Sequence, residues 1–531
     1  MTTRIPVLIC GGGIAGLTAA LELHRQGVRA VLVEKHADTS PLPKARRIDP
    51  RSTEVFRLLG LADEVDRASA PLAGFDDVLV GPTMAEARAP ENMAARRGLA
   101  DRMSALSPAP NVLCPQNVLE PVLRRAAEER SVSVRFGTEL VSFTQDDTGV
   151  TALLRPVDGD PYELTADYLI AADGARSPIR TSLGIPLGGH GHLADNLDLY
   201  FRADLTDLAR ARPFNLCRIT NPELPGAFLS VNGTDRWLFS TSDFPDAAGL
   251  DDEDWHDLLR TAIGVPDVEV DLLGRMPWES AMRVADRFAT GRVFLVGDAA
   301  HVMPPMAAAG ANTAIADAAN LSWKLAAVLD GTAGPALLDT YHVERHPVGY
   351  ATAERSSQVV GNVGDMLSSF GQGANQSGDR MATLFGTQYT DGALIPDNRG
   401  PAPTDHYAPA GRPGTRIPHA WLDFTTSTVD LAEPGLTLVS GPHDERWSTE
   451  ARHLGLRHVR VQVQSWLDEV ALPADGALLL RPDTIIAWHS TSNVPLADAL
   501  ARILATASPD EQDRQGDATG GMFGTATAAT P

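Results

Sequence analysis

The chain has 531 residues, of which 43% are hydrophobic and 21% charged, so it is long enough for about two to four domains with separate cores. Its formal net charge of −23 argues against a nucleic-acid partner, because phosphate backbones are bound by clustered lysine and arginine. The cysteines, Cys10, Cys114 and Cys217, lie far apart without a CxxC pair, which excludes a disulfide scaffold and a thiolate zinc site.

The N-terminal segment MTTRIPVLICGGGIAGLTAALEL is basic and then apolar, as a secretion signal is. Consecutive glycines interrupt the apolar stretch, and the charged ELHRQG follows without a small-residue cleavage site. The segment therefore predicts neither a signal peptide nor a membrane span. We expect a cytoplasmic protein with no membrane partner.

Residues 4–10, RIPVLIC, are apolar and rich in branched side chains, which predicts a buried parallel strand. Gly11, Gly13 and Gly16 follow with the spacing GxGxxG at the start of a predicted helix. Gly11 permits a tight turn, Gly13 lets a pyrophosphate approach the backbone, and Gly16 lets the helix pack on the strand. The helix N-terminus then offers unpaired N–H groups and a positive dipole end to the phosphates.

A second predicted strand, VRAVLVEK, begins at Val28 and brings Glu34 to its end. A carboxylate at this distance from the glycine turn can accept hydrogen bonds from both ribose hydroxyls of an adenosine. Strand, helix, strand and acid together predict a dinucleotide site, whereas a glycine turn alone is also found in other α/β proteins. The motif does not distinguish NAD from FAD.

Two later segments, ADGARSPIR at 172–180 and GRVFLVGDAAHVMPP at 291–305, accompany the segment GGGIAGL. The three segments resemble the fingerprints of the FAD-dependent aromatic hydroxylases, the single-component class A flavoprotein monooxygenases that include phenol and aromatic polyketide hydroxylases. Other similar segments extend the resemblance over residues 4 to about 350: PKARRIDPRSTEVFRLLGL at 43–61, QNVLEPVLRRAA at 116–127, NLSWKLAAVL at 320–329 and LLDTYHVERHPV at 337–348. The resemblance implies that the dinucleotide is FAD.

The resemblance also implies which residues hold FAD. They lie in the fingerprints and in the segments between them: Gly11, Gly13, Ile14, Ala15, Gly16, Glu34, Lys35, Arg46, Gln116, Leu140, Asp173, Gly174, Asp298, Pro305, Gly310, Ala311 and Asn312. Arg46 and Gln116 are expected at phosphate or ribityl oxygens, with Arg47 and Arg51 as competing candidates for Arg46. The backbone at Leu140 is expected to meet the adenine.

Asp298 follows the apolar run RVFLVG, and open α/β sheets bind ligands at the carboxyl ends of their strands. The resemblance assigns this aspartate to the ribityl chain. It also points the next helix, from about Asn312, at the flavin pyrimidine ring, where N–H groups stabilise negative charge. Pro304 and Pro305 stiffen the loop, although a proline-capped, alanine-rich core helix is the alternative interpretation. His301 is interpreted as a structural residue.

Two further segments, the D-G motif and the loop at Ala307, concern reduction of the flavin. Asp173 and Gly174 form the D-G motif, to which the resemblance assigns a role in binding both FAD and the reductant NAD(P)H; Arg180 is left outside the site because it could cap a helix. Ala307 stands where many members have glycine, and alanine lacks the backbone freedom of glycine. We expect Ala307→Gly to change flavin reduction more than FAD affinity.

Between Pro186 and Trp278 the pattern changes to alternating strands, the first beginning near residue 196. This resembles the antiparallel middle domain of the family, which roofs the flavin and carries the substrate. Residues 75–105 are expected to join it. GGHGH at 188–192 is interpreted as a flexible loop without the partners that a metal site requires.

The fold class predicted is α/β: a Rossmann-like FAD domain, an inserted antiparallel-sheet substrate domain and a C-terminal thioredoxin-like domain. The FAD domain is assigned to 1–74, 106–185 and 280–400, and the substrate domain to 75–105 and 186–279. The thioredoxin-like domain is assigned to 410–507, without redox activity because it lacks CxxC, and 508–531 is expected to be disordered.

The resemblance implies an NAD(P)H- and O2-dependent hydroxylase that acts on a small aromatic substrate through a C4a-hydroperoxyflavin. Phenols and polycyclic polyketides are the implied substrates, with a role in antibiotic biosynthesis. Baeyer-Villiger or rearrangement chemistry on the same fold is one alternative, and a binding protein without turnover is another. No catalytic base is identified, and a monomer or homodimer is expected.

Overall fold

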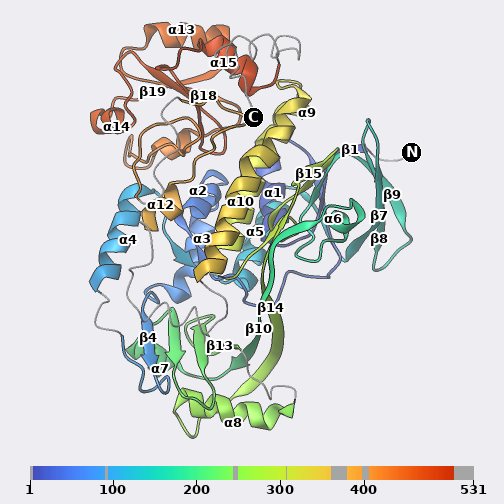
Figure 1. Ribbon diagram of the computed structural model, residues 1–531, viewed down its shortest axis with the longest axis vertical. Coiled ribbons are helices and arrows are strands. Elements are labelled where there is room, and N and C mark those ends of the chain that lie inside the picture. The colour runs from blue at the N-terminus through green and yellow to red at the C-terminus, as the bar shows by residue number, and fades with distance from the viewer. Residues whose placement is uncertain are drawn as a thin grey trace, which may run out of the picture.

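The computed structural model describes residues 4–89, 94–242, 249–305, 308–359, 380–397 and 406–506, with the side chains of 94–97, 99, 100 and 359 left aside. The predictions made for Ala307 and for the tail 508–531 lie outside these ranges. Figure 1 shows an eight-stranded sheet near the middle of the long axis, a seven-stranded sheet at the lower end and a four-stranded sheet at the upper end. No helix of the described residues is long and apolar enough to cross a membrane.

The eight-stranded sheet is built on the predicted N-terminal strand. Its strands lie in the order β15-β16-β9-β1-β2-β6, and neighbouring strands from β16 to β6 pair in parallel. The bounds are β1 (Arg4–Cys10), β2 (Ala30–Glu34), β6 (Ser133–Phe136), β9 (Tyr162–Ala171), β15 (Ala289–Thr290) and β16 (Val293–Leu295). A hairpin of β7 (Thr138–Gln145) and β8 (Val150–Pro156) continues from β9.

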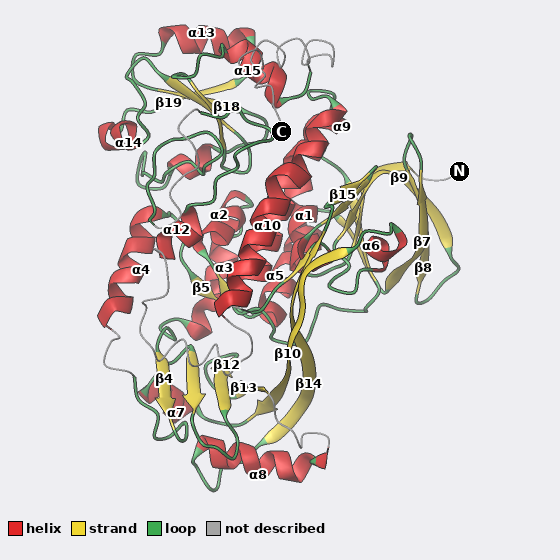
Figure 2. Cartoon of the chain, in the orientation of Figure 1, coloured by secondary structure: helices red, strands yellow, loops and turns green. Residues whose placement is uncertain are grey.

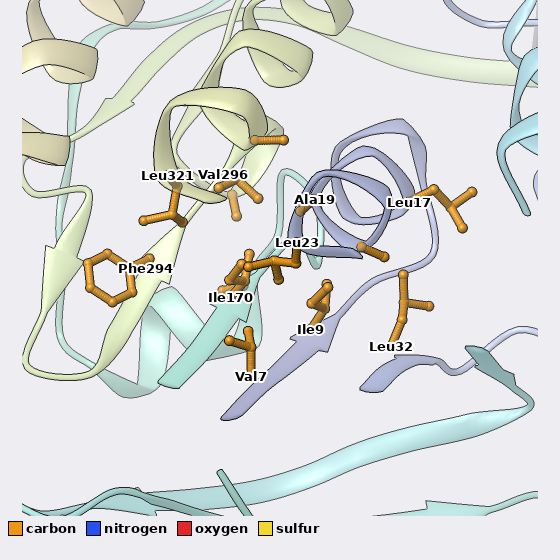
Figure 3. Close-up of a cluster of buried hydrophobic side chains, with 14 of the residues drawn as sticks. Val7, Ile9, Leu17, Ala19, Leu23, Leu32, Ile170, Phe294, Val296 and Leu321 are labelled. Carbon is orange, nitrogen blue, oxygen red and sulfur yellow. The ribbon is translucent and has the colours of Figure 1, made fainter. Parts of the chain in front are cut away.

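The core of this sheet explains why its strands form. Both α1 (Ile14–Arg25) and α9 (Ala309–Leu329) lie over the strands, and α1 also contacts α5 (Gln116–Glu129). Figure 3 shows apolar side chains of α1 and α9 above those of β1, β2, β9 and β16. Val7, Ile9, Leu17 and Ile170 are inaccessible to solvent. Strands covered in this way need continuous apolar runs, which is the pattern RIPVLIC shows.

The remaining elements around this sheet are short, except for one long helix. They are β3 (Arg47–Ile48), α2 (Pro50–Leu58), α3 (Ala62–Ser69), η1 (Ala70–Leu72), β5 (Val112–Leu113), α6 (Pro178–Ser182), η4 (Gly297–Ala299), β17 (His301–Val302), η6 (Pro335–Asp339), α10 (Thr340–Val359) and α12 (Arg380–Phe385). β3 and β5 pair as a two-stranded antiparallel ribbon. This ribbon brings two segments more than sixty residues apart in the sequence side by side.

The seven-stranded sheet has the order β17-β14-β10-β13-β12-β11-β4 and is antiparallel except at β11–β4. Its further elements are β4 (Val78–Gly81), β10 (Leu187–Arg202), α7 (Thr206–Ala211), β11 (Leu216–Ile219), β12 (Gly226–Ser230), β13 (Arg236–Ser242), α8 (Asp252–Ile263) and β14 (Asp271–Ala285). Figure 2 shows α8 below this sheet. β4 reaches it from the N-terminal half of the chain, whereas α4 (Ala94–Leu106) ends against α2, where Ser107 donates to Glu54.

Two predictions about the start of this sheet are wrong. The first strand begins at Leu187 rather than near 196, and GGHGH is part of β10 rather than a flexible loop. The strand pairs with β14 across register shifts at Gly188/Gly191 and His192/Ala194, and Gly189 has φ +109°. Bulges with glycines in the left-handed region keep the pairing while breaking the alternation on which strand prediction depends.

The four-stranded sheet follows the thioredoxin-like order of elements, as predicted. Its chain order is β18 (Thr437–Ser440), α13 (Glu445–His453), β19 (Arg457–Arg460), α14 (Gln464–Glu469), β20 (Ala477–Leu480), β21 (Ile486–His489) and α15 (Leu496–Ile503), after η7 (Thr428–Leu431). The sheet order is β19-β18-β20-β21, with β18 and β19 parallel and the other pairs antiparallel. No cysteine lies in this part of the chain.

Buried charges join this C-terminal module to α9 and α10. Glu344 of α10 accepts from Lys324 Nζ at 2.8 Å and from Arg481 Nη1 and Nη2, both at 2.8 Å. Asp317 of α9 accepts from Arg345 Nε at 2.7 Å. We call these five residues the ion network. Burial raises the pKa of the Glu344 carboxyl, but Arg481 and Lys324 outweigh that effect and hold the pKa well below its usual range.

Candidate FAD site

The predicted glycine turn has the close contacts that its motif requires. Gly11 has φ +115°, and a Cβ there would lie 2.1 Å from the carbonyl oxygen of Ala172, the residue that follows β9. A Cβ on Gly16 would lie 1.9 Å from the carbonyl oxygen of Gly11. Both positions therefore need glycine for the fold itself.

Gly13 differs from the other two glycines. Its backbone has an ordinary φ of −81°, and a Cβ there would meet only Glu120 Oε1, at 3.4 Å. Gly13 caps α1 without a side-chain hydrogen bond, so Ile14, Ala15 and Gly16 form a first turn whose N–H groups face outward. The protein does not itself require a glycine at this position, whereas a phosphate held on the turn would.

Glu34 lies at the end of β2, beside this turn. Its carboxylate accepts from the N–H of Gly12 at 2.7 Å and from the N–H of His36 at 2.9 Å. The side chain is 14% exposed, and lone pairs remain for further donors. Lys35, the next residue, is exposed. The carboxylate is thus held rigidly at the strand end where a ribose is expected.

Arg46 lies in the segment before β3, next to Gln116. Cys114 N donates to Arg46 O, and Gln116 N donates to Ala45 O, both at 2.7 Å. The Gln116 side chain donates to Glu120 Oε1 at 2.6 Å, and that oxygen faces Gly13. The chain therefore brings Arg46, Gln116 and the glycine turn into one region.

The Arg46 guanidinium is buried without a counter-ion. Only Nη1 has a partner, Asn215 O at 3.1 Å; Nε and Nη2 have none. Burial, aided by the neighbouring Arg47, lowers the pKa of Arg46 to about 9. A buried charge without partners is costly, so an anionic ligand is the simplest explanation for its presence.

The two competing arginines have partners in the protein. Arg51 Nη1 donates to Glu54 at 2.7 Å and to Thr484 of the C-terminal module at 3.1 Å. Arg47 lies in the β3–β5 ribbon. Of the three candidates, Arg46 is the one with buried guanidinium nitrogens, Nε and Nη2, that have no hydrogen-bond partner.

Asp173 and Gly174 follow β9 and lie against the glycine turn. A Cβ on Gly11 would lie 3.1 Å from Asp173 N. The Asp173 carboxylate accepts from Ser177 Oγ at 2.6 Å and from Ile179 N at 3.1 Å, so it already builds the turn into α6. Gly174, with φ +82° and open space around its Cα, is the accessible part of the motif.

Arg180 proves to be a link between two fingerprints. Its Nη1 donates to Ala175 O and to Ala299 O, both at 3.1 Å. It therefore ties the D-G loop to η4, which carries Asp298. These two hydrogen bonds give Arg180 a structural role.

Asp298 is accessible to solvent although protein surrounds it closely. The surroundings raise the pKa of its carboxyl, and His301 and Lys44 oppose that effect only in part. Among the described residues, no hydrogen bond to this carboxylate is present. The Asp298 carboxylate is therefore an unoccupied acceptor that can receive a hydrogen bond from a ligand hydroxyl group.

The first turn of α9 faces Asp298. A Cβ on Gly310 would lie 4.0 Å from Asp298 Oδ1, and Ala311 is half-buried next to it. The helix begins three residues before the predicted Asn312, and its N-cap, Ala308, has no side-chain hydrogen bond and a left-handed φ of +54°. Its first N–H groups thus lack a side-chain cap. Pro305 is exposed in the preceding loop.

The Asn312 side chain is fully occupied within the protein. Its Oδ1 accepts from Asp49 N at 3.1 Å and from Ser52 Oγ at 2.7 Å, while Nδ2 donates to the carbonyls of Arg47 and Ala308. The side chain fastens α9 to α2, which leaves the backbone N–H as the group that can reach a ligand. A neighbouring cavity of about 50 Å³, between Arg51 and Asp483, is too small for a flavin.

His301 and Leu140 complete the predicted set. His301 is inaccessible and lies 2.7 Å from Asp317 Oδ2, which also accepts from Gly297 N, so it joins β17 to α9. This placement agrees with a structural role. Leu140 is partly buried in β7 against the core of the parallel sheet. Its backbone takes part in the β7–β8 pairing at a register shift.

Two residues near the site were not predicted. Glu120 is buried beside Gly13, accepts from Ser40 N at 3.0 Å, and has its pKa raised by burial. Lys44 is close enough to lower the pKa of both Glu120 and Asp298. Both belong to segments already singled out, PKARR and QNVLE, but only the fold shows that they meet here.

These groups fit an anionic dinucleotide. The two unpartnered nitrogens of Arg46, the open space at Gly13 and the free acceptor Asp298 are what a pyrophosphate and a ribityl chain require. The contacts described above connect all three fingerprints. Among the described residues, no group of three or more histidines, cysteines or acids is placed to hold a metal ion.

Comparison with known proteins agrees with this chemistry. Residues 4–356 match the FAD binding domain family, and residues 410–507 match the family described as aromatic-ring hydroxylase, C-terminal. Tetracenomycin B2 monooxygenase-dioxygenase of Streptomyces olivaceus is 39% identical, over 94% of this chain and 99% of that protein.

Two solved structures share the fold. Aklavinone-11 hydroxylase, in a ternary complex with FAD and aklavinone, has a TM-score of 0.83 and 32% identity over 95% of this chain and 100% of its own. The flavin-dependent monooxygenase PieE, in complex with FAD and substrate, has a TM-score of 0.82 and 34% identity over 95% of this chain and 99% of its own. With matches that extend over nearly the whole chain, the protein belongs to the FAD-dependent aromatic-ring hydroxylases, which are flavoprotein monooxygenases.

Proposed function

We propose that the protein hydroxylates a polycyclic phenolic substrate of the polyketide type, with FAD as cofactor, NAD(P)H as reductant and O2 as oxygen donor. The observation that carries this proposal is the buried Arg46, whose Nε and Nη2 have no partner, next to the glycine turn that the protein leaves open at Gly13. The substrate class rests on the similar proteins, whose names refer to tetracenomycin B2 and aklavinone.

We assign FAD contacts as follows. Gly11, Gly13, Ile14, Ala15 and Gly16 bind the pyrophosphate through the turn and the N-terminus of α1. Glu34 accepts from the adenosine ribose, with Lys35 beside it, and the Leu140 backbone lies near the adenine. Arg46 and Gln116 bind phosphate or ribityl oxygens, and Asp298 accepts from a ribityl hydroxyl. Asp173 contacts FAD through its backbone, and Gly174 leaves space for the ligand to approach the chain.

When bound, FAD supplies the redox chemistry, because it takes electrons from NAD(P)H and passes them to O2. The residues of this chain bind, orient and desolvate. The N–H groups of Gly310, Ala311 and Asn312 point outward at the start of α9, where the helix dipole favours negative charge. Pro305 fixes the backbone of the loop in front of them.

We divide the chain into three domains on the same basis. The FAD domain comprises 1–74, 106–185 and 280–400, the middle domain 75–105 and 186–279, and the thioredoxin-like domain 410–507. The support is that β4 pairs with β11, that α1 packs with α9, and that β18 to β21 form a separate sheet. We place the protein in the cytoplasm as a monomer or homodimer.

The test is the oxidation of NADH and of NADPH by the FAD-loaded protein, with and without a panel of polyphenols and hydroxylated polycyclic aromatics. We expect oxidation to accelerate with one class of compound and the product to contain one additional oxygen atom derived from labelled O2. A ring-expanded lactone as the product would instead establish Baeyer-Villiger chemistry. Colourless protein that binds no FAD would overturn the proposal.

A further inference from the structure

The seven-stranded sheet has two faces of different character. The face toward α8 is a large apolar core that contains Leu199, Phe239 and Trp255, all inaccessible to solvent. Side chains alternate along a strand, so the residues between the core residues of β10 lie on the opposite face. Asn196 and Asp198 are two of these.

The strand register identifies their neighbours on this second face. Asp198 lies opposite Ser240 on β13 and opposite Met276 on β14. Asn196 lies opposite Trp278, and Ala194, two residues earlier on the same face, lies opposite Ser280. Residues opposite one another share a face. We call the group formed by Asn196, Asp198, Ser240, Trp278 and Ser280 the polar row.

An apolar cluster borders the polar row. Val78, Leu216 and Ala227 are buried there, with Leu229 and Trp278 packed against them, and the cluster is separate from the α8 core. The second face therefore combines buried apolar side chains with a line of polar groups. A planar, oxygenated aromatic molecule has the same combination of surfaces.

Three groups of the polar row lack hydrogen-bond partners: Asn196 Oδ1, Trp278 Nε1 and Ser280 Oγ. Asn196 is 5% exposed and Ser280 is 2% exposed. Buried polar atoms are almost always paired, so each of these needs an explanation. A hydroxyl donor and a carbonyl acceptor on a ligand would satisfy them.

Asp198 is the one acid in the polar row. Ser240 Oγ donates to Asp198 Oδ1 at 2.5 Å, which fixes the carboxylate and leaves Oδ2 for a further donor. Burial raises the pKa of this carboxyl, and Ser240 and Trp278 lower it in part. Asp198 is half-buried rather than sealed within the sheet, so a ligand can reach it.

Both ends of the second face adjoin the candidate FAD site. On β14, Arg283 and Val284 pair with Val302 and His301, which lie in the fingerprint that carries Asp298. At the opposite edge, Arg46 donates to Asn215 O, one residue before β11. A molecule on the polar row is therefore held between the two segments that we assign to FAD.

We propose that Asp198, fixed by Ser240, accepts a hydrogen bond from a phenolic hydroxyl of the substrate and so selects for hydroxylated rings, with Asn196 and Ser280 pairing to further oxygens. The inference rests on the proposed function. A phenolic O–H that donates to a carboxylate shifts electron density toward the ring, which favours electrophilic hydroxylation ortho or para to that oxygen. The contact thus orients the substrate and activates it.

The test compares two probes on the FAD-loaded protein: 2,6-dihydroxyanthraquinone, whose hydroxyls have no intramolecular acceptor, and anthraquinone, which has the same ring system without hydroxyls. Binding is measured through the change in flavin fluorescence. The variant is Asp198→Asn, and the control is Asp195→Asn, on the same strand but 85% exposed. We expect Asp198→Asn to lower the affinity for the dihydroxy probe by about tenfold or more, because one charge-assisted hydrogen bond is lost. The affinity for anthraquinone should fall by less than about twofold.

The assignment would be overturned if Asp198→Asn weakened the binding of both probes equally or of neither. It would also be overturned if Asp195→Asn weakened binding of the dihydroxy probe as much, or if the wild type bound both probes with the same affinity. Should Asp198→Asn fail to fold, Ser240→Ala takes its place, with the same selective loss expected at about threefold. Failure of the proposed function is seen separately, because wild-type FAD content and product formation measure it without reference to the probe ratio.

Discussion

The ion network and the candidate FAD site both contain buried charged side chains. They differ in whether the protein itself provides the hydrogen-bond partners of those charges. In the network Glu344 receives three hydrogen bonds from Lys324 and Arg481, all from within the chain. In the FAD site Arg46 is equally well buried, yet two of its nitrogens have no partner. The first region is complete as a protein structure, and the second is complete only with an anion.

This difference separates structural charges from functional ones better than burial does. Arg51, a candidate for the same role as Arg46, is satisfied by Glu54 and Thr484. Asp317 is satisfied by Arg345 and His301, whereas Asp298 accepts nothing from the described residues. A satisfied charge should matter for stability and an unsatisfied one for ligand binding. The predictions below test that division.

The largest expected effect is on stability, from breaking the ion network. Glu344→Ala leaves Lys324 and Arg481 buried without their shared acid, so we expect the free energy of unfolding to fall by about 3–5 kcal/mol. Denaturant titration measures it. The control is Glu433→Ala, which removes an exposed partner of Arg457 at 3.7 Å and should cost less than about 1 kcal/mol. Equal losses would show that the network contributes no more than a surface pair.

Gly13→Ala should abolish FAD retention while the protein stays folded. The fold leaves room for the new Cβ, 3.4 Å from Glu120 Oε1, so the methyl group competes only with phosphate. Gly16→Ala is the matched control, because its Cβ would lie 1.9 Å from a carbonyl oxygen and should disrupt folding itself. Visible absorption and circular dichroism measure the two outcomes. A folded Gly13→Ala protein with normal flavin content would contradict the assignment of the turn.

Glu34→Ala should weaken FAD binding by about 1–3 kcal/mol, the range for a lost charge-assisted hydrogen bond. Because Glu34 also accepts from two backbone N–H groups, the unfolding of the flavin-free protein is measured alongside. Glu139→Ala, which removes an exposed partner of Arg155, serves as the control. An unchanged FAD dissociation constant in Glu34→Ala would assign the carboxylate to the turn alone.

The smallest effect concerns pH and the flavin-free protein. The pKa of Asp298 is raised by its surroundings, so the native state holds this proton more tightly than the unfolded chain does. Its contribution to stability is present at low pH and is lost as pH rises from about 4 through the raised value. Relative to Asp298→Asn, the wild type should lose stability over that interval. A constant difference between the two proteins from acid to neutral pH would contradict the shift.

Much of the fold could be predicted because its signals are local. The apolar run of β1, the glycine spacing and the acid at Glu34 each depend on neighbours within one βαβ unit. The start of β10 could not be predicted, because its bulges at Gly188–Ala194 break the alternation of apolar and polar residues. Only the pairing with β14 shows that this segment is a strand. Local periodicity identifies regular strands and misses bulged ones.

The site residues divide in the same way. The choice of Arg46 over Arg51 depends on Thr484 and Glu54, which are far away in the sequence from one another and adjacent only in the fold. Lys44 and Glu120 were not predicted for the same reason. The side chain of Asn312 forms its hydrogen bonds within the protein, for example with Ser52. A sequence shows which groups are present, but hydrogen-bond satisfaction is a property of the assembled structure.

The most direct test measures two quantities on two variants, Arg46→Met and Arg51→Met: the FAD dissociation constant and the free energy of unfolding of the flavin-free protein. We expect Arg46→Met to weaken FAD by about tenfold or more and to leave the flavin-free protein as stable or more stable, because an uncompensated buried charge is removed. Arg51→Met should lower stability and change FAD affinity by less than about twofold. The reverse pattern, with FAD affinity dependent on Arg51 and stability on Arg46, would contradict the claim that unsatisfied buried charge marks the flavin site.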